Sequence, residues 1–190
     1  YLSMKIRAIS KIGDISYGIP VFQGNHLMLF YNRDMVKTPI TDWQQLKEQS
    51  TTFASTVNFP ITWNYNEMYW LIPFISAYHG WPMQGDNVTL DTQGMIQALR
   101  FYQKLSTDRM VDPNCDHDCS VTRFENGQSA YLINGDWIIH SLEEKMGSKL
   151  GIATLPKVEG QTMYPMFGSY VLSFPNLQKD TEKYKILENF

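Results

Sequence analysis

The chain has 190 residues, of which 43% are apolar and 18% charged, and this composition excludes general disorder. Aromatic residues make up 14%, which is more than a core of this size needs. Its 19 acidic and 16 basic residues are mixed along the chain and give a net charge of −3, so it lacks the basic surface of a nucleic-acid or anionic-membrane binder. No apolar run approaches the roughly 20 residues of a membrane-spanning helix.

The first elements alternate between strand and helix. Residues 15–21 and 26–31 are predicted strands, and the second is a nearly continuous apolar run, as in a buried strand. Thr41 is predicted to cap the following helix, with Gln44 completing a capping box. Residues 52–57 are predicted to form a short strand.

A longer helix is predicted over residues 64–79. It starts at Asn64 or Asn66 and stops before Gly80. Pro73 lies well inside it and should kink it, because proline removes a backbone donor and its ring clashes with the preceding turn.

The next helix is capped by Asp91, and Met95, Leu99, Tyr102 and Leu105 fall on its core face. The remaining predicted elements are a helix at 120–126, a strand at 130–133, a helix at 136–144, strands at 149–155 and 169–173, and a helix after Pro175. Strands that alternate with helices in this way indicate an α/β architecture.

Both ends of the chain have the character of truncations. Tyr1 begins neither a signal peptide nor a natural start, and the last helical pattern runs almost to Phe190 without a stop signal. We therefore expect an internal piece of a longer protein.

The two cysteines, Cys115 and Cys119, are separated by three residues. In an oxidising compartment they would form a small disulfide loop, and in a reducing one they would be free thiols or half a metal site. A disulfide across so short a loop brings no large entropic gain.

Motifs for catalysis, phosphate binding and metal binding are missing. The four histidines are scattered, and the sequence contains no nucleophile elbow, phosphate loop or zinc-protease motif. Asp112, Asn114 and Asp116 alternate like calcium ligands, but the glycine and the glutamate that a calcium loop requires are absent. We predict no metal, no cofactor and no catalytic residue.

Two segments combine aromatic rings with carboxylates and amides, residues 63–70 and 134–137. A sugar presents CH groups on one face and hydroxyls around its edge, so its site needs flat rings together with polar groups that take paired hydrogen bonds. The alternative is structural: Glu67 would complete a capping box begun by Asn64, and the rings would pack in the core.

A series of motifs runs through the chain in a fixed order. It consists of Tyr17-Gly18-Ile19-Pro20, Tyr31-Asn32-Arg33-Asp34, Thr41-Asp42-Trp43, Glu67-Met68-Tyr69-Trp70 with Pro73 and Gly80, Phe124-Glu125-Asn126-Gly127 with Ala130, Ile133-Asn134-Gly135-Asp136-Trp137, and Gly151-Ile152-Ala153 with Leu155-Pro156 and Gly160-Gln161. Order and spacing resemble the maltose/maltodextrin-binding protein family, solute-binding proteins of ABC importers, over about residues 15–175.

The resemblance implies an α/β fold of the periplasmic binding protein-like type II class, with this chain supplying mostly one lobe of a two-lobed fold. Residues 1–24 would end the first lobe and enter the hinge. Residues 25–170 would form an incomplete second, C-terminal lobe. Residues 171–190 would be the hinge return and the start of a first-lobe helix, and the segments 22–27 and 169–174 would be hinge strands.

The resemblance also implies site residues, at those positions of this sequence that match a pocket position of the family. Glu67, Tyr69 and Trp70 match its second-lobe pocket segment, where an acid and two aromatic residues contact sugar, and Trp137 matches its stacking tryptophan. Asn25 falls where maltose binders have a hinge-region carboxylate, so an oligosaccharide other than maltose is open.

Two positions depart from the family's pattern. Asp136 replaces a proline that is common in the family, and His117 lies near a pocket tyrosine without matching it.

The resemblance implies a carbohydrate-binding component of a bacterial ABC sugar importer that captures an oligosaccharide by hinge closure. Its partners would be the oligosaccharide and a membrane permease, and it would be a monomer, periplasmic or lipid-anchored outside the cell, without enzymatic activity. The alternatives are a sugar-sensing or other solute-recognition module on the same fold and a glycoside-active domain with Glu67 and Asp136 as paired carboxylates.

Overall fold

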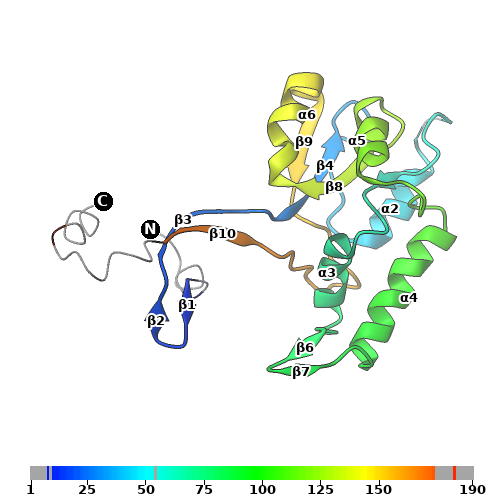
Figure 1. The fold of residues 1–190 in the computed structure, drawn as a ribbon. Coiled ribbons are helices and arrows are strands. Elements are labelled where there is room, and N and C mark those ends of the chain that lie inside the picture. Colours follow the sequence, from blue (N-terminus) through cyan, green and yellow to red (C-terminus); the bar gives the residue numbers. More distant parts are fainter. Residues whose placement is uncertain (1–7, 9, 54, 174–181, 183–190) are drawn as a thin grey trace. The chain divides into compact units, whose positions relative to one another are not determined.

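The computed structural model describes residues 8, 10–53, 55–173 and 182. The chain divides into two compact units, one formed by residues 1–24 and 167–190 and the other by residues 25–166 (Figure 1). The helix predicted after Pro175 lies outside the described residues except at residue 182.

The first unit consists of short antiparallel pairings. Its described strands are β1 (Lys11–Ile12), β2 (Ile15–Ser16), β3 (Ile19–Gly24) and β10 (Gly168–Leu172). β1 pairs with β2, and β3 pairs antiparallel with β10. The strand predicted at 15–21 is therefore interrupted at Tyr17 and Gly18, where the Tyr17 N–H donates to the carbonyl of Ser10, the residue before β1.

The second unit is built on a four-stranded mixed sheet with strand order β5–β8–β4–β9. The strands are β4 (Leu27–Asn32), β5 (Ile61–Thr62), β8 (Tyr131–Gly135) and β9 (Leu150–Ala153). β4 is antiparallel to both β8 and β9, whereas β5 runs parallel to β8. The strand predicted at 26–31 is confirmed, and its apolar run is explained by its place inside the sheet.

Helices cover both faces of this sheet (Figure 1). They are α2 (Trp43–Ser50), α3 (Met68–Ala77), α4 (Gln93–Thr107), α5 (His117–Glu125) and α6 (Ile139–Met146), with the 3-10 turns η1 (Asp136–Ile138) and η2 (Gly147–Lys149) and the hairpin β6 (Met83–Gln84) and β7 (Asn87–Val88). Because side chains alternate along a strand, Leu29 and Ile133 pack with α2, α3 and α4, while Phe30 and Leu132 pack with α5 and α6. The α/β prediction is confirmed.

Helix starts differ from the prediction by one or more residues. α2 is capped by Asp42, whose Oδ1 accepts the Gln44 N–H at 3.0 Å, while the Thr41 hydroxyl donates to the Gln45 side chain at 3.3 Å. Likewise Thr92, one residue after the predicted Asp91, caps α4 through its hydroxyl.

Two further predictions are corrected by packing. Residues 52, 55 and 56 lie in turns and residue 53 in a bend, so the described residues of 52–57 do not form the predicted strand. On α4, Met95, Tyr102 and Leu105 are buried as predicted, but Leu99 is 46% exposed and Ala98 takes the core position. Among the described residues, no helix has both the length and the apolar character needed to cross a membrane.

Candidate functional site

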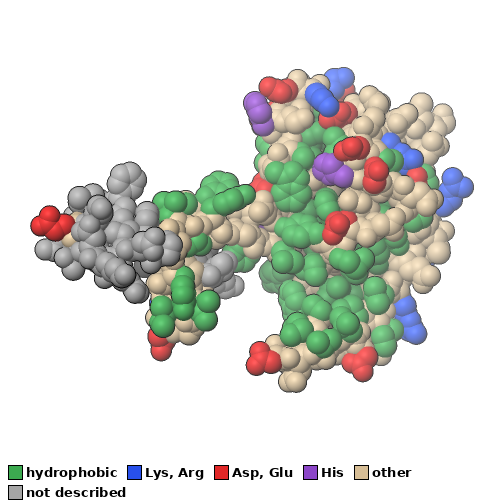
Figure 2. Space-filling view, in the orientation of Figure 1, with side chains coloured by type: hydrophobic (Ala, Val, Ile, Leu, Met, Phe, Trp, Pro, Cys, Tyr) green, Lys and Arg blue, Asp and Glu red, His purple; other side chains and the backbone are tan. Residues whose placement is uncertain are grey.

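A cavity of about 470 Å³ opens on the unit of residues 25–166. It is lined by Asn25, Asn64, Glu67, Tyr69, Trp70, His117 and Trp137. All five residues that the sequence singled out for ligand binding therefore line one cavity. In the space-filling view, hydrophobic side chains gather on the same unit over α3 and around the β6–β7 hairpin (Figure 2).

The start of α3 supplies three of the lining residues. Glu67 is the N-cap, and its Oε1 accepts the Tyr69 N–H at 3.4 Å, so it is the cap itself rather than the third residue of a box begun by Asn64. Its side chain is otherwise exposed, so the carboxylate is accessible at the cavity.

Trp70 is the fixed wall of the cavity. It is only 6% exposed, belongs to the main core, and donates its indole N–H to the Ile133 carbonyl at 2.9 Å. The structural reading of Trp70 is therefore correct as far as the core is concerned, although one part of the ring faces the cavity.

Trp137 is the accessible ring of the site, with 44% of its surface exposed. It follows β8 through Gly135, and a Cβ at position 135 would lie 2.0 Å from the indole Cζ3, so only glycine lets the ring lie this close to the backbone. The Trp137 ring meets Trp70 edge-on at 6.3 Å and lies 6.1 Å from Tyr69. These contacts hold an exposed aromatic plate in place.

Asn25 and Tyr69 are joined directly, because the Tyr69 hydroxyl donates to the Asn25 carbonyl. Asn25 has a left-handed backbone with φ of 57°, and its N–H donates to Asp136 Oδ1 at 3.0 Å. Burial, followed by the nearby Asp136 carboxylate, raises the pKa of the Tyr69 hydroxyl above its usual value of 10.0, so Tyr69 stays a neutral donor at physiological pH.

Sequence reasoning did not include Asn64 and His117 among the site residues. Asn64 lies inside the aromatic segment 63–70, so its amide was a signal that could have been used. His117 begins α5, and its ring lies 6.4 Å from Trp70. No local pattern links His117 to α3, but the family resemblance, which puts His117 near a pocket tyrosine, was a signal that could have been used.

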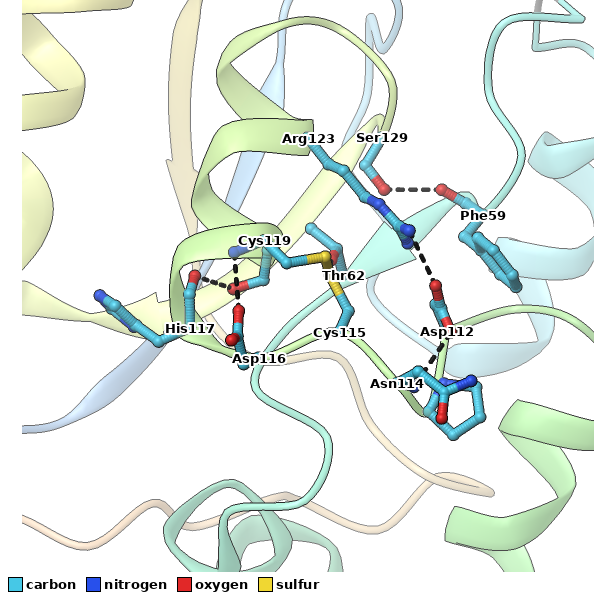
Figure 3. The surroundings of a disulfide bond; sticks show 12 residues. Phe59, Thr62, Asp112, Asn114, Cys115, Asp116, His117, Cys119, Arg123 and Ser129 are labelled. Carbon is cyan, nitrogen blue, oxygen red and sulfur yellow. Dashed lines mark hydrogen bonds and ion pairs between the residues drawn. A yellow bond between two sulfur atoms is a disulfide. The ribbon is translucent and has the colours of Figure 1, made fainter.

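The cysteines form a disulfide at the entry to α5, with Cα atoms of Cys115 and Cys119 5.3 Å apart (Figure 3). Asp116, between them, caps α5 by accepting the Cys119 N–H at 2.9 Å. The side chain of His117 points away from the disulfide in this view. The disulfide therefore braces the turn from which His117 enters the cavity wall.

Asp112 and Asp116, two of the carboxylates around this turn, bind protein groups. Asp112 pairs with Arg123 at 2.8 Å and also accepts the Asn114 N–H. In the part of the chain that the structure describes, no group of three or more His, Cys, Asp or Glu side chains could hold a metal ion.

Replacing both cysteines by alanine should lower the free energy of unfolding by about 2 kcal/mol, because a loop this short limits the entropy removed from the unfolded chain. Urea unfolding would measure the change. A reductant should lower the stability of the wild type to the same value and leave the Cys115→Ala/Cys119→Ala variant unaffected. Equal midpoints for variant and oxidised wild type would contradict the prediction.

Residues 2–182 match the family model described as bacterial extracellular solute-binding protein. The maltotriose-binding protein of Pyrococcus abyssi (strain GE5 / Orsay) is 24% identical over 155 residues, which cover 78% of this chain and 33% of that protein. The chain thus spans about a third of the length of this curated relative.

Proposed function

The chain belongs to the bacterial extracellular solute-binding protein family, whose members are not enzymes, and from this premise we propose that it forms part of the sugar-binding component of a bacterial ABC importer. The membership excludes the glycoside-active alternative with Glu67 and Asp136 as paired carboxylates. The proposed ligand is an oligosaccharide of the maltose/maltodextrin type.

The observation that carries the sugar proposal is the composition of the cavity wall. Trp137 offers an exposed ring for the CH face of a sugar, while Glu67, Asn64 and His117 place polar groups beside it. This combination suits a ligand with an apolar face and a ring of hydroxyls. The likeness to a maltotriose-binding protein supports the same ligand class.

We further propose that residues 25–170 form most of the second lobe of a type II periplasmic binding protein-like fold. Residues 1–24 and 171–190 would belong to the first lobe and the hinge. A ligand that contacts both lobes would favour the closed state by its differential affinity, and the closed protein would dock on a membrane permease. The protein would act as a monomer in the periplasm or anchored by lipid outside the cell.

Isothermal titration calorimetry on the protein expressed from its complete gene tests the proposal. The ligand series runs from glucose through maltose and maltotriose to longer maltodextrins, with amino acids and short peptides as unrelated solutes. We expect saturable binding of an oligosaccharide in the micromolar range or tighter, which corresponds to about 8 kcal/mol or more. Binding of an unrelated solute with no response to any saccharide would overturn the assignment.

A further inference from the structure

Asp136 is not among the residues that line the cavity, yet its side chain and backbone tie two parts of the site together. Oδ1 accepts the Asn25 N–H at 3.0 Å, and Oδ2 lies 3.2 Å from His26 Nδ1. The Asp136 N–H in turn donates to the His26 carbonyl at 3.2 Å. Asp136 thereby connects η1, the turn that carries Trp137, to the residues immediately before β4.

The residue that Asp136 holds has an uncommon backbone conformation. Asn25 has φ of 57°, in the left-handed region that asparagine adopts more readily than most non-glycine residues but less readily than glycine. In that conformation the Asn25 carbonyl accepts the Tyr69 hydroxyl while its side chain lines the cavity. A change at Asn25 would therefore move both its own amide and the hydrogen-bond partner of Tyr69.

Asn25 is also the first residue of the unit 25–166 and follows Gly24, the last residue of β3. The carboxylate of Asp136 thus acts on the backbone where the chain enters this unit. The side chain of Asp136 is only 21% exposed, so little water competes with its two partners.

We propose that Asp136 is a positioning residue of the binding site: it holds Asn25 in its left-handed conformation and so fixes the Asn25 amide and the Tyr69 ring for the ligand. This inference rests on the proposed function for the identity of the ligand. Burial, and after it the Asp136 carboxylate, raises the pKa of the Tyr69 hydroxyl.

The matched variants are Asp136→Ala and Asp136→Asn. Alanine removes the acceptor of the Asn25 N–H, whereas asparagine keeps an oxygen at Oδ1. With maltotriose as the probe, we expect Asp136→Ala to weaken binding about tenfold and Asp136→Asn to stay within about threefold of the wild type. The unfolding midpoint of each variant shows whether it is folded under the conditions of the titration.

An Asn25→Gly background separates positioning from a general structural role. Glycine adopts a left-handed backbone at no steric cost, so it depends less than asparagine on the carboxylate to reach that conformation. In that background Asp136→Ala should lose less than about threefold in affinity relative to Asn25→Gly alone. A purely structural role would give the same tenfold loss in both backgrounds and would overturn the inference.

Amide hydrogen exchange at Asn25, followed by NMR, needs no ligand. We expect exchange to be faster in Asp136→Ala and unchanged in Asp136→Asn. If no saccharide binds the wild type but the exchange follows this pattern, the positioning role stands and the proposed ligand fails. Unchanged exchange in a folded Asp136→Ala variant overturns the positioning role, whatever binds.

Discussion

Replacing Trp137 by alanine should weaken the binding of maltotriose roughly 10- to 100-fold while the protein stays folded. Removing the ring abolishes the apolar plate on which the sugar face would stack, and burial of about 60–100 Å² of apolar surface contributes about 1.5–2.5 kcal/mol. Each 1.4 kcal/mol corresponds to a factor of ten in affinity. Calorimetric titration of the variant and the wild type would measure the difference.

The reason to expect an effect of this size lies in the placement of the ring. Trp137 is 44% exposed, so much of its surface is free for a ligand, and Gly135, Tyr69 and Trp70 hold it in one position. A ring that is already fixed loses little side-chain entropy when the ligand arrives.

Trp81→Ala is the matched control. Trp81 is 45% exposed and does not line the cavity, so its loss removes the same side chain from a similarly exposed position. Its affinity for maltotriose should stay within about twofold of the wild type. Wild-type affinity in Trp137→Ala would show that the site has been misplaced, and an equal loss in both variants would point to a non-specific effect of removing a tryptophan.

The largest effect on stability is expected for Trp63→Ala, which should lower the free energy of unfolding by about 3–5 kcal/mol. Trp63 is fully buried, and its ring lies between 5.8 and 6.0 Å from those of Trp43, Phe74 and Tyr102. Truncation would leave a cavity among rigid rings that cannot collapse to fill it. Urea unfolding and the melting temperature, expected to fall by roughly 6–20 °C, would report the loss.

Besides packing against these rings, Trp63 makes a hydrogen bond. Its indole N–H donates to the Tyr102 hydroxyl at 2.7 Å, and that hydroxyl donates to the Tyr65 carbonyl at 2.8 Å. Trp63→Phe keeps an aromatic ring but breaks this chain, so it should lose less stability than Trp63→Ala, yet more than Trp81→Ala, which serves again as the exposed control. If Trp63→Ala unfolded at the midpoint of Trp81→Ala, the packing account of the core would be wrong.

Much of the secondary structure could be predicted from local patterns. The apolar run of β4, the periodicity of α4 and the alternation of strands with helices are written in neighbouring residues, because side-chain direction repeats every two or 3.6 residues. Helix starts were less accurate, since Thr41 and Asp42 are both competent caps. In the structure the Gln45 side chain accepts both the N–H and the hydroxyl of Thr41, and Asp42 is the cap.

The residues of the candidate site were selected from the sequence mainly through the family's motif series. Periodicity and composition alone left Glu67, Tyr69 and Trp70 open to a structural reading, and the structure shows that two of them do have structural duties. Glu67 caps α3, and Trp70 anchors to Ile133. Glu67 and Trp70 also line the cavity, and their role in binding stays a proposal.

The sequence by itself determined the fold class, the family and the residue types suited to a sugar. The tertiary structure decided which of these residues meet: His117 comes to Trp70 across 47 positions, and Asp136 reaches Asn25 across 111. Such contacts depend on strand order and on the way β8 returns beside β4. Local propensities act over a few residues and carry no information on that pairing, so the cavity and the Asp136 linkage emerge only in the folded chain.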